Sequence, residues 1–196
     1  RSNTTYTITT GHQLNIFTGP MYFLYKILTA INLAETLKAA HPDYDFIPVY
    51  WMASEDHDFE EISHFRLFGE EHRWKDEQEG PVGRMSPHSI AHLLRQIPEI
   101  PENFRNAYLG HDTLANAMRS IVNDLFGNYG LLVLDGDNAR LKKMMEYVVI
   151  DDMTRHSSNA LVNQSSERLQ QLGYKSQVYP RHINFFYMED GMRERI

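Results

Sequence analysis

The run from Phe46 to Ala53, FIPVYWMA, is the feature that most limits what this chain can fold into. It is continuously apolar, and polar residues bound it on both sides. Such a run is typical of a strand that is buried on both faces of a parallel sheet. A β-branched, alternating run precedes it at Tyr6 to Thr10, and a helical repeat of apolar residues from Gly19-Pro20 to about Ala40 separates the two. Strand, helix and strand in this order predict a βαβ unit with a right-handed crossover.

The pattern continues to alternate beyond this unit. Residues 62–86 predict an inserted hairpin or meander, and residues 87–126 predict helices that break at Pro98 and Pro101. The run GLLVLD, Gly130 to Asp135, predicts another buried strand with an acid at its carboxyl end. We therefore expect an α/β fold, a Rossmann-like parallel sheet flanked by helices with a small inserted hairpin.

The last third of the chain is predicted to be mostly helical. Residues 139–172 have helical spacing with one interruption, near Asp151 or Ser157. The segment INFFYMEDGMRERI then predicts two strands around Asp190-Gly191, a strong hairpin signal. Its aromatic group, residues 185–187, is expected in the core of a strand.

Composition excludes several classes of protein. The 196 residues carry a net charge of −7, which argues against a general nucleic-acid binder. Cysteine is absent, so disulfides and thiolate metal sites are excluded, which fits a cytoplasmic protein. No apolar run reaches the length of a membrane span and no signal peptide is visible. Because the first residue is not Met and the last residues stop just after a hairpin signal, we expect a chain truncated at both ends.

The first candidate site is Gly11-His12-Gln13, at the tip of the first predicted strand. Ligands of open α/β sheets bind at the carboxyl ends of strands. Glycine allows close approach to the backbone, and Gly19 with the following helix start offers amides for a phosphate or carboxylate. The alternative is an ordinary strand-to-helix loop with two turn glycines, since the run matches neither a P-loop nor a dinucleotide fingerprint.

The second candidate site is Glu55-Asp56-His57-Asp58, just past the second predicted strand. Asp58 has capping-box spacing to Glu61, so a helix cap explains it. Capping does not explain Glu55, Asp56 and His57, for which we expect a role as general base, ammonium ligand or metal ligand. Together they would crowd negative charge without an internal cation, at a cost in stability.

The third candidate site follows the strand that ends at Asp135. Asp135 suits a ribose hydroxyl or an amine, or serves as a turn acceptor. Asn138 suits the cap of the next helix.

Four stretches in this order, TTGHQLNIFTGPMYFLYK, PVYWMASEDHDFEEI, GLLVLDGDNARLK and FFYMEDGMRERI, resemble the BshC family, the cysteine-adding ligases of bacillithiol biosynthesis. Together they span nearly the whole chain. The family is similar to class I nucleotidyltransferases and aminoacyl-tRNA synthetases, with a Rossmann-like core, a connecting-peptide domain and a C-terminal coiled coil that forms homodimers. The resemblance implies a longer protein, in which residues 1–184 form the core and residues 185–196 begin the connecting domain.

The resemblance also implies an activity. Cysteine is joined to glucosaminyl malate by an amide bond, in the last step of bacillithiol biosynthesis, with ATP or ADP as the expected nucleotide. Class I enzymes carry His-x-Gly-His at the first strand-to-helix junction; here Gly11 and His12 match, while Thr9 replaces the first histidine. The lysine-rich second signature of those enzymes is not present in the 196 residues.

The predicted site combines the three clusters. The expected catalytic residues are His12, Asp56 and His57. The expected substrate- or nucleotide-binding residues are Gly11, Gln13, Gly19, Glu55, Asp58, Asp135 and Asn138. We predict no resident metal, no nucleic acid and no membrane partner. Two alternatives stay open: a metal-dependent hydrolase that uses His57 with the acids, and a non-catalytic nucleotide-binding module.

Overall fold

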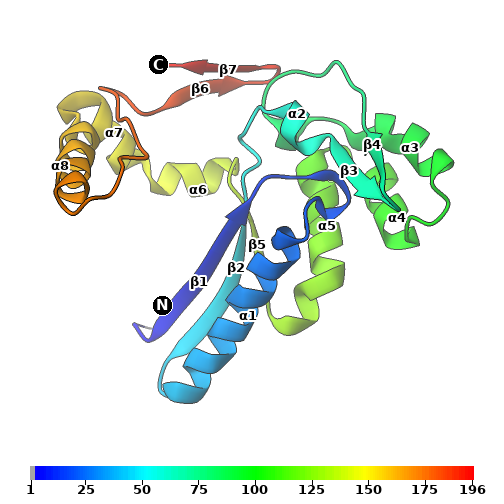
Figure 1. The fold of residues 1–196 in the computed structure, drawn as a ribbon, viewed down its shortest axis with the longest axis horizontal. Helices are drawn as coiled ribbons and strands as arrows, with labels where there is room; N and C mark the ends of the chain where they lie inside the picture. The colour runs from blue at the N-terminus through cyan, green and yellow to red at the C-terminus, as the bar shows by residue number, and fades with distance from the viewer. Residues whose placement is uncertain (1–2) are drawn as a thin grey trace. The chain divides into compact units, whose positions relative to one another are not determined.

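The computed structural model describes residues 3–196 and divides into two compact units, Arg1–Asp137 and Asn138–Ile196. A parallel sheet is the centre of the first unit (Figure 1). Its strands are β1 (Thr5–His12), β2 (Asp45–Met52) and β5 (Leu132–Asp135), in the order β1-β2-β5. The predicted Rossmann-like α/β class is therefore confirmed.

Helix α1 (Tyr22–Ala40) connects β1 to β2 and packs on the sheet. Its buried face carries Phe23, Ile27 and Ile31, and the ring of Phe23 meets the ring of Tyr50 edge-on at 5.4 Å. Burial of such side chains contributes about 1.5–3 kcal/mol each, so this face fixes α1 against the sheet. The helix has the place that its apolar period predicts.

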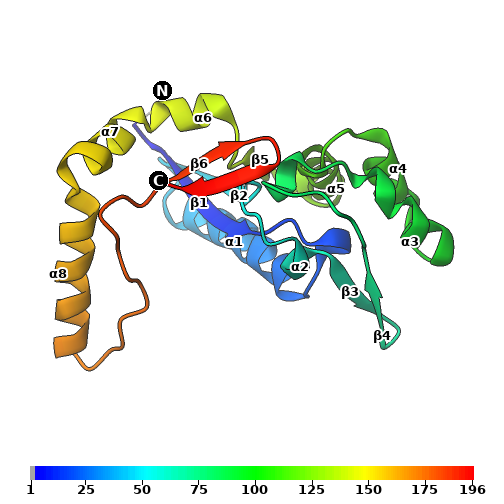
Figure 2. The ribbon, with the colours of Figure 1, turned by 90° about the horizontal axis from the view of Figure 1, so that it is seen from above.

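The long connection from β2 to β5 forms the rest of the first unit. It contains α2 (Phe59–Ile62), the antiparallel hairpin β3 (His64–Leu67) and β4 (Glu70–Arg73), then α3 (Ala91–Gln96), α4 (Glu102–Gly110) and α5 (Leu114–Phe126). Figure 2 shows the hairpin extending away from the sheet. It turns through Phe68 and Gly69, both with positive φ, and it confirms the predicted inserted hairpin.

Burial of the sheet is lower than predicted. Trp51 in β2 is 37% exposed and Leu132 in β5 is 53% exposed, so neither strand is buried over its whole length. In the part of the chain that the structure describes, β5 pairs with β2 alone. An edge strand with few covering side chains leaves its apolar residues open to solvent.

The second unit contains α6 (Ala139–Met144), α7 (Glu146–Arg155), α8 (Ser157–Gln171) and the hairpin β6 (Phe186–Glu189) and β7 (Met192–Arg195). The helical region breaks twice, at Met145 and at His156, where one interruption was expected; His156 has a left-handed φ of 54°. Phe186 and Tyr187 are 41% and 52% exposed, so they do not form a strand core. The Arg193 guanidinium covers the Phe186 ring at 3.7 Å, which explains how an exposed aromatic ring is accommodated. A domain boundary after residue 184 stays a prediction.

Candidate functional site

The strand tips bring the predicted clusters to one edge of the first unit. The parallel register aligns His12 with Met52 and Met52 with Asp135, so the segments after β1, β2 and β5 start side by side. The three clusters, up to Asp137 in the third, therefore lie at one edge of the sheet. Asn138 is the first residue of the second unit and caps α6, where its Oδ1 accepts from the amides of Arg140 at 3.0 Å and Leu141 at 3.3 Å.

His12 is the most unusual side chain at this edge. It is only 8% exposed, and neither ring nitrogen has a hydrogen-bond partner. Its ring stacks on Tyr22 at 4.9 Å and meets Phe23 edge-on at 5.5 Å, both in the first turn of α1. Burial, followed by the nearby Lys26 ammonium, lowers the His12 pKa, while the neighbouring Gln13 backbone acts in the other direction. The imidazole is therefore neutral at pH 7, with both ring nitrogens buried and without a hydrogen-bond partner.

Gln13 joins the first cluster to the second. Its Nε2 donates to Asp56 Oδ2 at 3.2 Å and to Glu61 Oε2 at 2.6 Å. The amide of His57 also donates to Asp56 Oδ1 at 2.7 Å. Burial alone would raise the Asp56 pKa, but these bonds outweigh it and lower that pKa. The expected cost of crowded negative charge is thus reduced by amide donors, which the sequence pattern of acids does not reveal.

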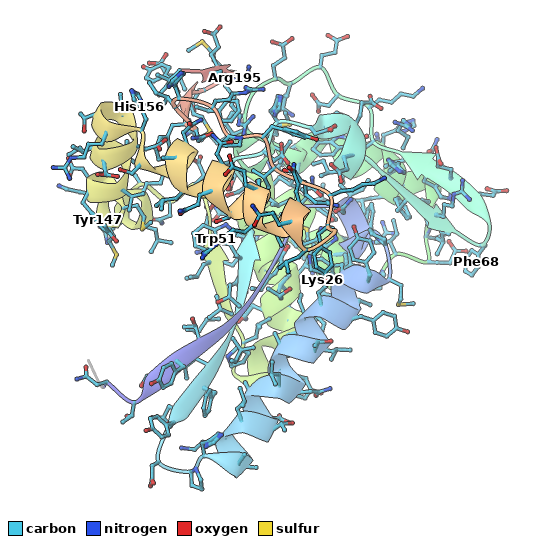
Figure 3. The ribbon with its side chains drawn as sticks, turned by 60° about the vertical axis from the view of Figure 1, so that its left-hand side comes forward. Lys26, Trp51, Phe68, Tyr147, His156 and Arg195 are labelled. Atoms are coloured by element: carbon cyan, nitrogen blue, oxygen red, sulfur yellow. The ribbon has the colours of Figure 1, made fainter. Side chains whose placement is uncertain are left out.

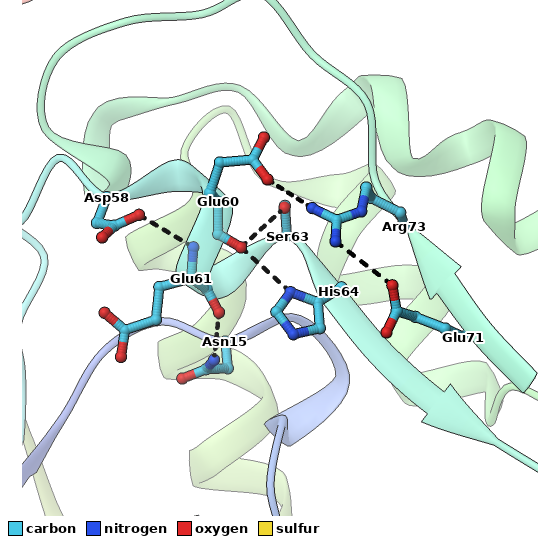
Figure 4. A network of polar contacts seen from close by, with 8 residues as sticks. All are labelled: Asn15, Asp58, Glu60, Glu61, Ser63, His64, Glu71 and Arg73. Carbon is cyan, nitrogen blue, oxygen red and sulfur yellow. Dashed lines mark hydrogen bonds and ion pairs between the residues drawn. The ribbon is translucent and has the colours of Figure 1, made fainter. Parts of the chain in front are cut away.

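Asp58 and Glu60 have local structural partners (Figure 4). Asp58 caps α2 by accepting from the Glu61 amide at 3.1 Å, as its spacing predicts. Glu60 forms an ion pair with Arg73 at 2.5 Å. His57 is exposed, with its Nδ1 3.4 Å from Asp56 Oδ1. Asp56 and Glu61 are the acids that face the Gln13 side chain.

Ser54 links the tips of β2 and β5. Its fully buried hydroxyl donates to Asp135 Oδ1 and accepts from the Asp137 amide at 3.0 Å. The same Asp137 amide lies 3.0 Å from Asp135 Oδ1. Asp135 therefore serves as a turn acceptor, one of the two roles left open. The Asp137 carboxylate receives a bidentate pair from Arg84, with Nε–Oδ2 at 2.5 Å and Nη2–Oδ1 at 3.2 Å.

Two glycines permit this close assembly. A Cβ on Gly136 would overlap the Glu55 carboxylate and lie 2.8 Å from Met52 O and from Trp51 Nε1. A Cβ on Gly83 would overlap the Ser54 side chain. Glu55 and Ser54 thus sit where only a backbone without a side chain can approach them.

Lys26 and Asn15 are site residues that the sequence reasoning missed. The Lys26 ammonium donates to the Gly11 carbonyl at the tip of β1, and Figure 3 shows Lys26 and Trp51 toward the same end of the sheet. Lys26 lies four residues after Tyr22, so helical spacing could have placed both on the His12 face of α1. Asn15 is packed against Gly19, which has φ +56°, and its Nδ2 donates to the Glu61 carbonyl at 3.1 Å. No local sequence signal distinguishes this asparagine.

The edge offers donors and acceptors for an anionic ligand and an amine. Helix α1 has no side-chain cap and no acid in its first turn, and Lys26 adds a positive charge near Gly11. His12 supplies a neutral base, and Asp56 supplies an ionised carboxylate. Among residues 3–196, no three His, Asp or Glu side chains converge as a metal site would require, and no helix is long and apolar enough to cross a membrane.

Comparison with known proteins gives a consistent family. The model described as "Bacillithiol biosynthesis BshC, N-terminal Rossmann-like domain" matches residues 1–196. The chain is 46% identical over 202 residues to a protein of Flavobacterium johnsoniae named "Putative cysteine ligase BshC", with 98% of this chain and 38% of that protein covered. Proteins of the same name from Flavobacterium psychrophilum and Cytophaga hutchinsonii are 48% and 45% identical, over 98% and 100% of this chain and 38% and 37% of their own lengths.

The chain thus spans less than two fifths of the three relatives named above, at 37–38% of their length. The family model covers it from end to end, and the parallel sheet has the Rossmann-like form that the model's description names. The chain belongs to the BshC family, as its N-terminal Rossmann-like domain.

Proposed function

We propose that the whole protein is a ligase that joins cysteine to glucosaminyl malate through an amide bond, completing bacillithiol biosynthesis. Family membership supports the reaction, and the named relatives carry the same description as cysteine ligases. The single structural observation that carries the proposal is His12, a buried imidazole with two unpartnered nitrogens at the tip of β1.

Amide formation needs a base at the attacking amine. The nitrogen of the amine forms a bond to the carbonyl carbon of an activated carboxyl group, the bond to the leaving oxygen breaks, and the nitrogen gives up a proton. His12 suits this proton because its lowered pKa keeps it neutral at pH 7. The ring of Tyr22 stacks on one face of the imidazole.

Asp56 suits the binding of an amine or hydroxyl group. Its lowered pKa keeps it ionised, and Gln13 and the His57 amide orient its two oxygens. His57 is exposed beside it, with its Nδ1 3.4 Å from Asp56 Oδ1. Glu55, close to Gly136, lies on the other side of the β2 tip and adds a second carboxylate.

The residues at the β1 tip fit a phosphate or carboxylate, and we propose that ATP or ADP binds there. Gly11 is exposed, a Cβ on it would make only ordinary contacts, and Lys26 and the uncapped start of α1 supply positive charge. Bound ATP would supply the leaving group that activates the carboxyl. Gly19, at φ +56°, keeps the approach to α1 free of a side chain.

The wider assembly is part of the same proposal. The whole protein would be a cytoplasmic homodimer that pairs through a C-terminal coiled coil, with small molecules rather than nucleic acid as partners. The net charge of −7 supports the exclusion of nucleic acid.

The test is a product assay on the whole protein with cysteine, glucosaminyl malate and ATP, read by mass spectrometry. We expect the amide product from wild type, a rate loss of about 100-fold or more in His12→Gln, and no loss in the exposed-surface control His88→Gln. Nucleotide binding without product would favour the binding-module alternative. Equal rates for His12→Gln and wild type would remove His12 from the mechanism.

A further inference from the structure

A cavity of about 640 Å³ lies between the start of α1 and the hairpin β3–β4. Its walls belong to the first unit alone. The residues that the argument uses are Asn15, Gly19, Tyr22, Glu61, Arg66 and Glu71. None of the sites predicted from the sequence includes the hairpin wall. Tyr22 is shared, because it lines this cavity and also stacks on His12.

One wall of the cavity offers a small number of hydrogen-bond donors. The segment from Gly19 to Tyr22 leads into α1, a helix of 19 residues with no side-chain cap and no acidic residue in its first turn. Pro20 has no N–H, and the amides of Gly19, Phe23 and Leu24 already donate to backbone carbonyls, so the amides of Met21 and Tyr22 are the donors left in this segment. The N-terminal end of such a helix carries partial positive charge and free amides, which favour a carboxylate.

Asn15, which packs against Gly19 and also lines the cavity, carries a buried acceptor without a partner. Asn15 is 6% exposed, and its Nδ2 donates to the Glu61 carbonyl at 3.1 Å, which fixes the orientation of the amide. The other atom of that amide, Oδ1, has no hydrogen-bond partner. Figure 4 shows this oxygen on the same side as the Glu61 carboxylate. A buried acceptor left unpaired lowers stability, and a donor on a ligand would offset that loss.

Charge decides between ligand classes. Gln13 donates to Glu61 Oε2, and no further partner of the Glu61 carboxylate is seen among the described residues. Arg66 and Glu71 form an exposed pair at 3.7 Å and offset each other at the rim. The cavity therefore combines a positive helix end with a negative Glu61 and an Asn15 acceptor. This pattern disfavours a dianion and matches a ligand that carries both charges.

We propose that this cavity binds the zwitterion of a free α-amino acid, with the carboxylate at the start of α1 and the ammonium at Asn15 Oδ1 and Glu61. The cavity shares Glu61 with the Gln13–Asp56 network, so the amino acid lies beside the proposed reaction centre. The inference rests on the proposed function only for the identity of the amino acid, which would be cysteine.

Calorimetry on the whole protein tests the proposal with three probes. L-cysteine has both charged groups, 3-mercaptopropionate lacks the amine, and cysteamine lacks the carboxylate. We expect L-cysteine to bind at least about tenfold more tightly than either analogue, since each analogue loses charge-assisted hydrogen bonds. Equal binding of the three probes would overturn the proposal.

Matched variants locate the ammonium. Glu61→Gln removes one charge from an exposed side chain, and we expect it to weaken L-cysteine about tenfold while leaving 3-mercaptopropionate unchanged. Glu60→Gln is the control, because its carboxylate pairs with Arg73 and does not line the cavity. Asn15→Ala should weaken L-cysteine as well, and Glu61→Gln carries the test if Asn15→Ala does not fold. Equal L-cysteine affinity in the two glutamine variants would overturn the proposal.

The outcome is separable from the proposed function. Wild-type product formation with unchanged L-cysteine binding in Glu61→Gln would retain the ligase and reject this subsite. Discriminating L-cysteine binding without product would retain the subsite and reject the ligase.

Discussion

Gly11 offers the sharpest separation between folding and ligand binding. It lies in β1 opposite Trp51, and its φ is not positive. A Cβ at this position would lie 3.5 Å from Trp51 O and 3.8 Å from Trp51 Cβ, which are ordinary van der Waals distances. Because glycine inside a strand costs about 0.5–1 kcal/mol relative to alanine, Gly11→Ala should leave the free energy of unfolding unchanged or raise it by that amount.

The expected loss in Gly11→Val is therefore a loss of binding. A branched side chain at the exposed strand tip would occupy the space that a phosphate or carboxylate needs, while valine remains favourable for a strand. We expect at least about a tenfold weaker affinity for ADP, or about 1.4 kcal/mol. Denaturant melts and calorimetric titration of the whole protein with ADP measure both quantities.

Gly136 is the matched control. It is buried, and a Cβ there would overlap the Glu55 carboxylate and lie 2.8 Å from Met52 O. Gly136→Ala should therefore lower the free energy of unfolding by about 1–3 kcal/mol, as overpacking does. The reasoning is refuted if Gly11→Ala destabilises the protein as much as Gly136→Ala, or if Gly11→Val binds ADP as wild type does.

Three further variants test the other clusters. Burial lowers the His12 pKa in the folded protein below 6.5, so the unfolded chain protonates at His12 at a higher pH than the folded protein does. The free energy of unfolding of wild type should therefore fall as the pH drops through about 6.5. In melts at about pH 5–8, His12→Gln should show a weaker dependence of this free energy on pH. Asp56→Asn should abolish product formation and lower the free energy of unfolding by less than about 1 kcal/mol. Asp58→Ala should lose about 1 kcal/mol of stability with its helix cap and should retain turnover. The reverse pattern in melts and product assays would show that Asp56 has a structural role. Asp135→Asn keeps an acceptor for the Ser54 hydroxyl, so it should lower the free energy of unfolding by less than about 1 kcal/mol. Asp135→Ala leaves that buried hydroxyl without an acceptor and should lower the free energy of unfolding by about 1–3 kcal/mol, as denaturant melts would measure.

Local patterns were enough to predict the elements that carry the sheet. The apolar period placed α1, and the apolar run at residues 46–53 placed β2 within one residue at each end. The spacing of Asp58 and Glu61 predicted the cap of α2. These features depend on neighbours within four residues, which a sequence displays directly.

Features that depend on distant partners could not be predicted in this way. The Ser54–Asp135 bond joins residues 81 positions apart, and the bonds of Gln13 to the second cluster span more than 40. The exposure of Phe186 was not predicted. The sequence of a hairpin does not show whether an aromatic ring packs in an apolar core or lies at the surface under a cation, as Phe186 lies under Arg193. The helix break that was not predicted, at Met145, has no glycine or proline in the sequence to mark it.

The segment between β1 and α1 concentrates departures from ordinary protein structure. Phe17 and Thr18 have left-handed φ values of 53° and 70°, which are costly for side chains of these types, at about 1–3 kcal/mol each. His12 and Asn15 carry buried polar atoms without partners in the same stretch. Other parts of the chain satisfy local rules well, as the side-chain caps of the helices after Asp58 and Thr113 show. Each of these departures lowers the stability of the fold. A ligand that donates a hydrogen bond to Asn15 or His12 would offset part of that loss. The residues of the strand-to-helix loop are therefore better explained by ligand binding than by folding.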